Sequence, residues 1–210
     1  MTPRRVLIAV VALLAVLLAG VLLGRALPST PGAQSVDVGF AQDMATHHQQ
    51  AVQMAVLAVE RTPSPDVQAL AEDMLLTQQN QVGRLQQLLG VWDQPVANTG
   101  EVMGWMAGTD LHARHLGEIQ QGRTMPGMAT AVELNRLREE TGEQFEVDFL
   151  QLMLRHHAGG IEMAEFAADR ATTEEVRSLA RAIAGSQTSE TELLTDLLAQ
   201  RGAEPLGPAA

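Results

Sequence analysis

The chain has 210 residues, of which 46% are hydrophobic, and this composition excludes a disordered chain and allows a folded domain of ordinary size. It contains no cysteine, so disulfides, zinc fingers, iron–sulfur clusters and thiolate copper sites are excluded. Its net charge of −11 disfavours nucleic acid as a partner, because the phosphate backbone would repel an acidic protein.

Residues 1–26 are predicted to be a signal peptide or a membrane anchor. Arg4 and Arg5 precede an uncharged apolar run from Val6 to Gly24, and Arg25 closes it. The run approaches the ~20 residues that span a bilayer, and arginines at its start are expected to stay in the cytoplasm. The rest of the chain should therefore be extracytoplasmic, either anchored in the membrane or secreted after cleavage. Residues 27–35 are predicted to be a flexible linker.

Residues 36–205 are predicted to form one domain whose two halves repeat each other at an offset of 109 residues. Between Val38 and Leu89, 17 of 52 positions are identical to their partners without a gap, which indicates duplication. Apolar residues recur every three or four positions, so each repeat, 36–91 and 143–200, is predicted to be a helical hairpin. The two hairpins predict an all-α four-helix bundle with a long crossover, 92–142.

In the first repeat, turn signals set the expected helix limits. The first helix is predicted to run from about Asp37 to Arg61. Ser64 is a plausible N-cap for the second helix, with Pro65 at its first position, and Gly90 can end that helix.

The crossover is predicted to contain two short helices. One covers 109–121, and the capping box Thr130-x-x-Glu133 opens the other. In the second repeat, Thr172-x-x-Glu175 is expected to cap the last helix in the same way.

Histidines and methionines gather at a few places in the sequence. The pairs His47-His48 and His156-His157 occupy equivalent repeat positions, each beginning three residues after a methionine. Residues three apart share one face of a helix, so a thioether and an imidazole can approach the same ion. We therefore predict a metal site. The candidate ligands are Met44, His47, His48, Met54, Met153, His156, His157, Met163, Met103, Met106, His112, His115, Met125, Met128, Asp37 and Glu146.

The softness of these donors favours particular metals. Thioether with imidazole suits copper(I) and, by the same argument, silver(I). Zinc would use the histidines and leave the methionines unexplained, whereas copper(II) would prefer the imidazoles with a carboxylate such as Asp37 or Glu146. A di-iron centre is disfavoured because no histidine follows an acidic residue by three positions.

The motifs resemble those of the family called domain of unknown function 305, from about Val36 to Leu198. The resemblance rests on Asp37-x-x-Phe40, Met44-x-x-His47-His48, Met125-Pro-Gly-Met128, Gly142-x-x-Phe145 and Met153-x-x-His156-His157. It implies an exported bacterial protein with a ferritin-like helical fold, and some family members are implicated in periplasmic copper binding and resistance. The sequence departs from its own repeat at Glu146, which stands where the first repeat has Asp37.

Three functions follow from these patterns. The first is extracytoplasmic copper(I) storage, buffering, delivery or resistance, with the Met-rich crossover folding over the bundle as a lid. The second is a metal-dependent oxidoreductase, although the sequence has no recognisable nucleophile–base set. The third is a metal-free helical interaction module in which Met and His only pack, as we expect for Met74. A second copy of the chain, in a homodimer, is a further candidate partner.

Overall fold

The computed structural model describes residues 2–26, 30–120 and 124–206, which fall into two units, Met1–Thr30 and Pro31–Ala210. The first unit contains helix α1 (Pro3–Ala26). Its segment Pro3–Gly20 is long and apolar enough to cross a membrane, with a mean hydropathy of 2.0, and a signal sequence has the same properties. Of the predicted linker, residues 27–29 lie outside the described residues.

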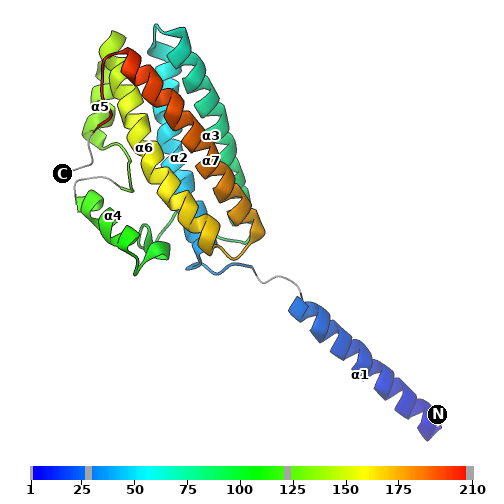
Figure 1. The fold of residues 1–210 in the computed structure, drawn as a ribbon. Coiled ribbons are helices and arrows are strands. Elements are labelled where there is room, and N and C mark those ends of the chain that lie inside the picture. Colours follow the sequence, from blue (N-terminus) through cyan, green and yellow to red (C-terminus); the bar gives the residue numbers. More distant parts are fainter. Residues whose placement is uncertain (1, 27–29, 121–123, 207–210) are drawn as a thin grey trace. The chain divides into compact units, whose positions relative to one another are not determined.

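The second unit is built on four long helices (Figure 1). They are α2 (Val36–Arg61), α3 (Pro65–Val91), α6 (Gly142–Arg170) and α7 (Glu174–Gln200). α2 packs on α3 and α6 packs on α7 as two hairpins, and α2 and α6 run antiparallel against each other. The described part of the chain contains no strand, so the predicted all-α fold of two hairpins is confirmed.

The crossover between the hairpins carries three short helices. They are the 3-10 helix η1 (Gly104–Met106), α4 (Asp110–Gln120) and α5 (Ala131–Glu139). The predicted capping box at α5 is confirmed, because Thr130 and Glu133 exchange both of its hydrogen bonds.

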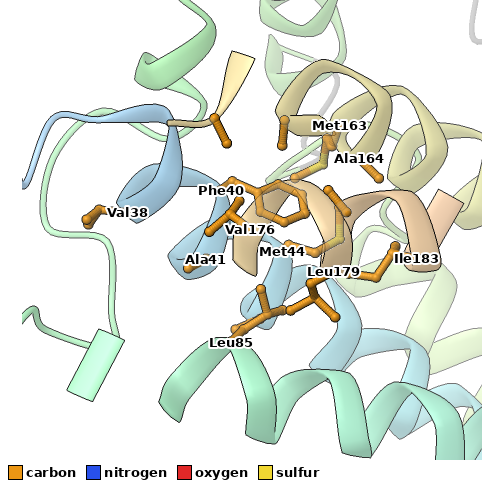
Figure 2. Packing of buried hydrophobic residues seen from close by; sticks show 14 of the residues in the cluster. Val38, Phe40, Ala41, Met44, Leu85, Met163, Ala164, Val176, Leu179 and Ile183 are labelled. Atoms are coloured by element: carbon orange, nitrogen blue, oxygen red, sulfur yellow. The ribbon is translucent and has the colours of Figure 1, made fainter. Parts of the chain in front are cut away.

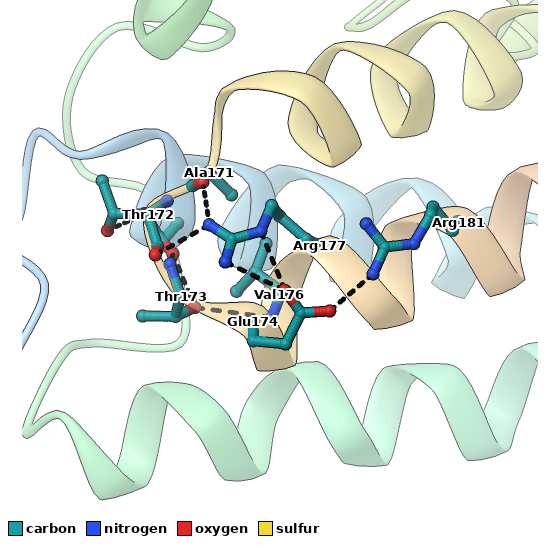
Figure 3. A network of polar contacts seen from close by, with 8 residues as sticks. Ala171, Thr172, Thr173, Glu174, Val176, Arg177 and Arg181 are labelled. Atoms are coloured by element: carbon teal, nitrogen blue, oxygen red, sulfur yellow. Dashed lines mark hydrogen bonds and ion pairs between the residues drawn. The ribbon is translucent and has the colours of Figure 1, made fainter.

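The predicted capping box Thr172-x-x-Glu175 of the last helix is wrong, because the helix is capped one residue later. Thr173 is the N-cap of α7, and its hydroxyl accepts from the Val176 amide. Thr172 instead donates through both its amide and its hydroxyl to the Asp37 carboxylate. Tertiary bonding to a side chain of another helix therefore replaces the local cap at Thr172. Arg177 also fixes this turn by donating to the carbonyl oxygens of Ala171 and Thr172 (Figure 3).

Two equivalent carboxylates tie each hairpin to the other. Asp37, at the start of α2, accepts four hydrogen bonds of 2.6–2.9 Å from Thr172 and Thr173 in the turn between α6 and α7. Glu146, at the start of α6, accepts from Thr62 and Ser64 in the turn between α2 and α3, and it also pairs with Arg201. Each repeat thus begins with a carboxylate that binds the turn of the other hairpin, and we call these two sets of bonds the clasps.

The apolar core consists of two clusters, one toward each end of the bundle. The first cluster surrounds the start of α2 and of α7 and includes Phe40, Met44, Leu85, Met163 and Leu179 (Figure 2). The second cluster lies around the end of α2 and the start of α6. It includes Met54, Met74, Phe145, Phe149 and Leu194. Met74 is 1% exposed within this second cluster, as its predicted packing role requires.

Candidate metal centre

A buried polar layer separates the two apolar clusters. On α2, residues up to Ala45 belong to the first cluster and residues from Ala51 onward to the second, and the histidine pair lies between them. The other three long helices show the same change from apolar to polar to apolar. The polar layer consists of His47, His48, Gln78, Gln81, His156, His157, Gln187 and Glu190, two residues from each helix.

The two inner histidines meet where α2 crosses α6. The ring centroids of His47 and His156 are 3.8 Å apart, and both side chains are fully buried. His47 Nε2 donates to the Pro126 carbonyl oxygen at 3.0 Å, and His156 Nε2 donates to the His47 carbonyl oxygen at 2.9 Å. The structure therefore brings the two repeat motifs together in the interior, as expected for a duplicated hairpin.

The two outer histidines each bond within their own hairpin. His48 Nε2 donates to Gln81 Oε1 at 2.7 Å, and His157 Nε2 donates to Glu190 Oε2 at 2.6 Å. Gln81 and Glu190 are equivalent positions of the repeat. The two repeats therefore share the hydrogen bond and differ in the chemical group that accepts it.

These bonds fix the tautomer of all four imidazoles. Each Nε2 faces an oxygen acceptor and so carries the proton, which leaves Nδ1 with a lone pair. The Nδ1 atoms of His47, His48, His156 and His157 are buried without a hydrogen-bond partner. An imidazole whose one nitrogen donates to an oxygen while the other presents a bare lone pair has the arrangement of a metal ligand.

Burial keeps the rings of His47, His48 and His156 neutral. Burial lowers the pKa of His47 to about 4 and, together with the neighbouring His47, that of His48 to about 3. Burial and the adjacent histidines also place the pKa of His156 well below its ordinary value. Neutral imidazoles at physiological pH are ready to bind a cation without first releasing a proton.

Two glutamines add further unsatisfied groups to the polar layer. Gln78 and Gln187 are 1% exposed, and neither the amide nitrogen nor the amide oxygen of either has a hydrogen-bond partner. A buried polar group left unpaired costs about 1–3 kcal/mol, so their retention in a core calls for a ligand, an ion or water in the layer.

The Met125–Met128 turn of the crossover is docked against the inner histidines. Its Pro126 carbonyl binds His47, and Gln50 of α2 exchanges two hydrogen bonds with the Ala129 backbone, at 3.0 and 2.6 Å. A Cβ at Gly127, whose φ is +69°, would collide with the Arg155 carbonyl oxygen. A Cβ at Gly159 would likewise collide with Pro126. Glycine at both positions allows the turn to lie directly on α6 beside His156.

Arg155 holds the same turn from the side of α6. It donates to the carbonyl oxygens of Gly127 and Met128 and forms two short bonds, 2.7 and 2.8 Å, with the Glu133 carboxylate. Although burial works to raise the pKa of Glu133, the bonds from Arg155 and Thr130 lower it to about 2. Arg155 thus joins α5 and the Met125–Met128 turn to the helix that carries His156.

The candidate thioethers divide between the two apolar clusters. Six belong to the first cluster and are at most 5% exposed, namely Met44, Met103, Met106, Met125, Met128 and Met163. Met54 and Met153 belong to the second cluster. Asp43 fixes the position of Met103 by accepting from its amide at 2.8 Å and from the Trp105 indole at 2.9 Å. Segments far apart in the sequence therefore bring their thioethers to one side of the polar layer.

The structure places His112 and His115 on α4, apart from the four layer histidines. Their Nε2 atoms lie 3.9 Å from carboxylate oxygens of Glu101 and Glu162, respectively. Both residues are buried, at 8% and 1% exposure. Each of these rings thus lies near a different carboxylate.

Asp37 and Glu146 are not brought to the histidines. Each carboxylate is taken up by the clasp bonds described above and precedes its histidine pair by ten residues, roughly 15 Å along a helix. Their side chains join helices in this structure, so we leave them out of the ligand set proposed below. Within the described residues, no group of three histidine or carboxylate side chains is placed to share a metal ion.

The sequence patterns above do not single out the four layer residues on α3 and α7. Gln78 and Gln187 are identical partners of the repeat, and Gln81 and Glu190 are equivalent positions. The available signal was a polar identity on helix faces that are otherwise apolar, three residues before a second polar position.

Comparison with known proteins places the chain in a family. The family model described as Domain of unknown function (DUF305) matches residues 37–198, and no curated protein matches. A crystal structure of a DUF305 protein from Streptomyces coelicolor is 41% identical and covers 84% of this chain and 100% of its own, with a TM-score of 0.74. A DUF305 fragment from Deinococcus radiodurans is 32% identical, covers 82% and 99%, and has a TM-score of 0.64.

More distant structures share the fold alone. CopM in its Cu(I)-bound form is 20% identical to this chain and covers 78% of it and 96% of the CopM chain, with a TM-score of 0.59. From the match of the family model and the similarity of the two DUF305 structures, this chain belongs to the DUF305 family.

Proposed function

We propose that this protein binds copper(I) outside the cytoplasm for storage, buffering, delivery or resistance. The observation that carries the proposal is the set of four buried imidazoles whose Nε2 atoms donate to oxygens and whose Nδ1 lone pairs have no partner. A bound proton, a neutral hydrogen-bond donor or a cation can satisfy such lone pairs, and the depressed pKa values of His47, His48 and His156 disfavour the bound proton.

The available donors select a soft metal. Imidazole nitrogen and thioether sulfur are the donors beside the polar layer, and the chain has no cysteine to compete with them. Because no three histidines or carboxylates of the described chain share a site, thioethers would complete the coordination. Copper(I) and silver(I) accept this donor set readily, whereas zinc gains little from a thioether.

The proposed ligands are drawn from the imidazoles of His47, His48, His156 and His157, of which no more than two would bind any one ion, and from thioethers of the first cluster. Met44 and Met163 come from the helices that cross at the site, and Met125 and Met128 come from the turn docked on it. Met103, Met106, His112 and His115 belong to the crossover and are proposed as a second group through which ions enter. Met54 and Met153 stand on the far side of the polar layer and are proposed to complete it there.

Two further findings support the proposal. CopM, a distant relative by fold, is described in Cu(I)-, Cu(II)- and Ag-bound forms. The N-terminal apolar helix α1 suits export or anchoring, which would expose the domain to metals outside the cytoplasm.

Anaerobic competition against a calibrated copper(I) chelator tests the function. We expect the purified domain to withdraw copper(I) from the chelator and to bind zinc much more weakly. Replacing both His47 and His156 with Asn should abolish competition, whereas the packing variant Met74→Leu should compete as the unaltered protein does. Absence of any competition by the unaltered protein would refute copper(I) binding.

A further inference from the structure

The two halves of the polar layer differ in one chemically important position. Gln81 and Glu190 are repeat equivalents, and each accepts a hydrogen bond from the outer histidine 33 residues before it, at 2.7 and 2.6 Å. The geometry is the same, but one acceptor is a neutral amide and the other a carboxylate. The second half of the layer therefore contains a carboxyl group where the first half has a neutral amide.

Glu190 is the acidic member of the polar layer, and its side chain is only 10% exposed. Its carboxylate pairs with His157 and, within the described residues, with no arginine. Other buried acids have partners away from the layer: Asp43 binds Trp105, Glu146 pairs with Arg201, and Asp148 pairs with Arg136. The remaining layer residues are glutamines and imidazoles of a single, Nε2-protonated tautomer.

We propose that Glu190 sets the charge of the metal centre at −1 and thereby makes it selective for a monovalent ion. This inference rests on the proposed function, since it concerns the same site. A monovalent cation makes the layer neutral, whereas a divalent cation leaves one uncompensated positive charge in an interior of low polarity. Donor softness alone would not distinguish ions by charge, so the carboxylate adds a second criterion.

The repeat itself supplies the test variants. Glu190→Gln recreates in the second hairpin the His–Gln pair that the first hairpin already contains, and it makes the layer neutral. Gln81→Glu creates a second His–Glu pair and a charge of −2. The double variant Gln81→Glu/Glu190→Gln keeps the charge at −1 but moves it to the other hairpin. Glu192→Gln removes the same charge from an exposed position two residues away and serves as the control.

Silver(I) and zinc(II) are suitable probes because neither changes oxidation state during the titration. We expect Glu190→Gln to weaken Ag⁺ binding by at least ~10-fold, because His157 keeps an acceptor but the charge that compensates the ion is lost. Gln81→Glu should strengthen Zn²⁺ binding relative to Ag⁺, also by ~10-fold or more. The double variant should restore Ag⁺ binding, which a purely positional role of Glu190 would not allow. Glu192→Gln should leave both affinities unchanged.

The outcomes separate this inference from the function on which it rests. If the unaltered protein binds neither Ag⁺ nor copper(I), the proposed function fails and this inference fails with it. If it binds Ag⁺ and Glu190→Gln binds Ag⁺ equally well, only the role of Glu190 is overturned. The same holds if the double variant stays as weak as Glu190→Gln, because position rather than charge would then matter. Thermal unfolding without metal checks that each variant is folded.

Discussion

Each layer imidazole is oriented by an oxygen atom that accepts from its Nε2, and this determines what its other nitrogen can do. Two of those oxygens are backbone carbonyls, at Pro126 and His47, so the orientation of the inner rings depends on the main chain of a turn and a helix. The outer rings depend on side chains of α3 and α7. No signal in the sequence connects Pro126 with His47, because 79 residues separate them and the bond uses a carbonyl that every residue possesses.

The buried histidines should make the metal-free protein sensitive to mild acid. The pKa of His47 is about 4 in the folded protein and 6.5 as its ordinary value, so the unfolded chain binds protons first as the pH falls. Stability should therefore be lost between pH 6.5 and pH 4, by about 3 kcal/mol from His47 alone. Urea unfolding at pH 7 and pH 5, with a chelator present, measures the loss.

Burial raises the pKa of Asp43, and burial with the neighbouring Asp148 raises that of Glu140, so both carboxyls oppose the histidines as the pH falls, and a histidine variant is needed to assign the loss. Asp37 and Glu133 have lowered pKa values, so their contributions disappear only as the pH falls below their ordinary values of 3.8 and 4.5. A His47→Gln variant should lose less stability between pH 7 and pH 5 than the unaltered protein. Equal losses in the variant and the unaltered protein would show that the ring of His47 is not held neutral.

Thioethers at the docked turn should matter for metal rather than for folding. Leu and Met fill similar volumes, so Met125→Leu/Met128→Leu should change metal-free stability by less than ~1.5 kcal/mol. Copper(I) affinity or stoichiometry should fall, as anaerobic titration would reveal. Met74→Leu, in the second cluster, should alter neither property. A double variant that binds copper(I) like its parent would assign the turn a structural role only.

The elements of the fold were largely predictable from the sequence, whereas their tertiary bonds were not. Apolar periodicity and the turn at Ser64-Pro65 predicted the first two helices within a few residues, because these signals act locally. The error at Thr172 arose because Asp37, 135 residues away, competes for its hydroxyl and amide. The same limit applies to the candidate site, where the histidine pairs were identified and their partners on α3 and α7 were not.

Because the Met125–Met128 turn packs closely on α6, we expect alanine at Gly159 to affect stability differently from alanine at Gly185. Alanine normally stabilises a helix by about 0.5–1 kcal/mol relative to glycine, and Gly185→Ala on α7 should do so because nothing lies near its Cβ position. Gly159→Ala should instead destabilise the protein and weaken copper(I) binding, since its Cβ would strike Pro126. Chemical denaturation of the two variants compares them directly, and a stabilised Gly159→Ala protein would contradict the docked position of the turn.

In the molecule as a whole, the two repeated hairpins carry both the polar layer and the bonds that join one hairpin to the other. Two hairpins that cross at the histidines bury one polar layer between two apolar clusters, and reciprocal clasps at Asp37 and Glu146 join the hairpins near their turns. The carboxylates that the sequence offered as ligands thus serve in the assembly of the bundle.

Removing the carboxylate of a clasp should lower the stability of the protein and leave its metal affinity unchanged. Asp37→Asn weakens charge-assisted bonds to Thr172 and Thr173, and we expect a loss of about 1.5–3 kcal/mol in unfolding free energy. Glu146→Gln should cost a similar amount through Arg201. Copper(I) affinity of either folded variant should equal that of the unaltered protein. A large loss of affinity without loss of stability would return these carboxylates to the ligand set.

X-ray absorption at the copper edge of the copper(I)-loaded protein tests the central claim most directly. Imidazole nitrogen and thioether sulfur scatter differently, so the spectrum reports which donors surround the ion. We predict a mixed shell of nitrogen and sulfur whose nitrogen contribution falls when His47 and His156 are replaced. A shell of oxygen and nitrogen without sulfur, or one unchanged by the loss of both histidines, would contradict a copper(I) centre in the polar layer.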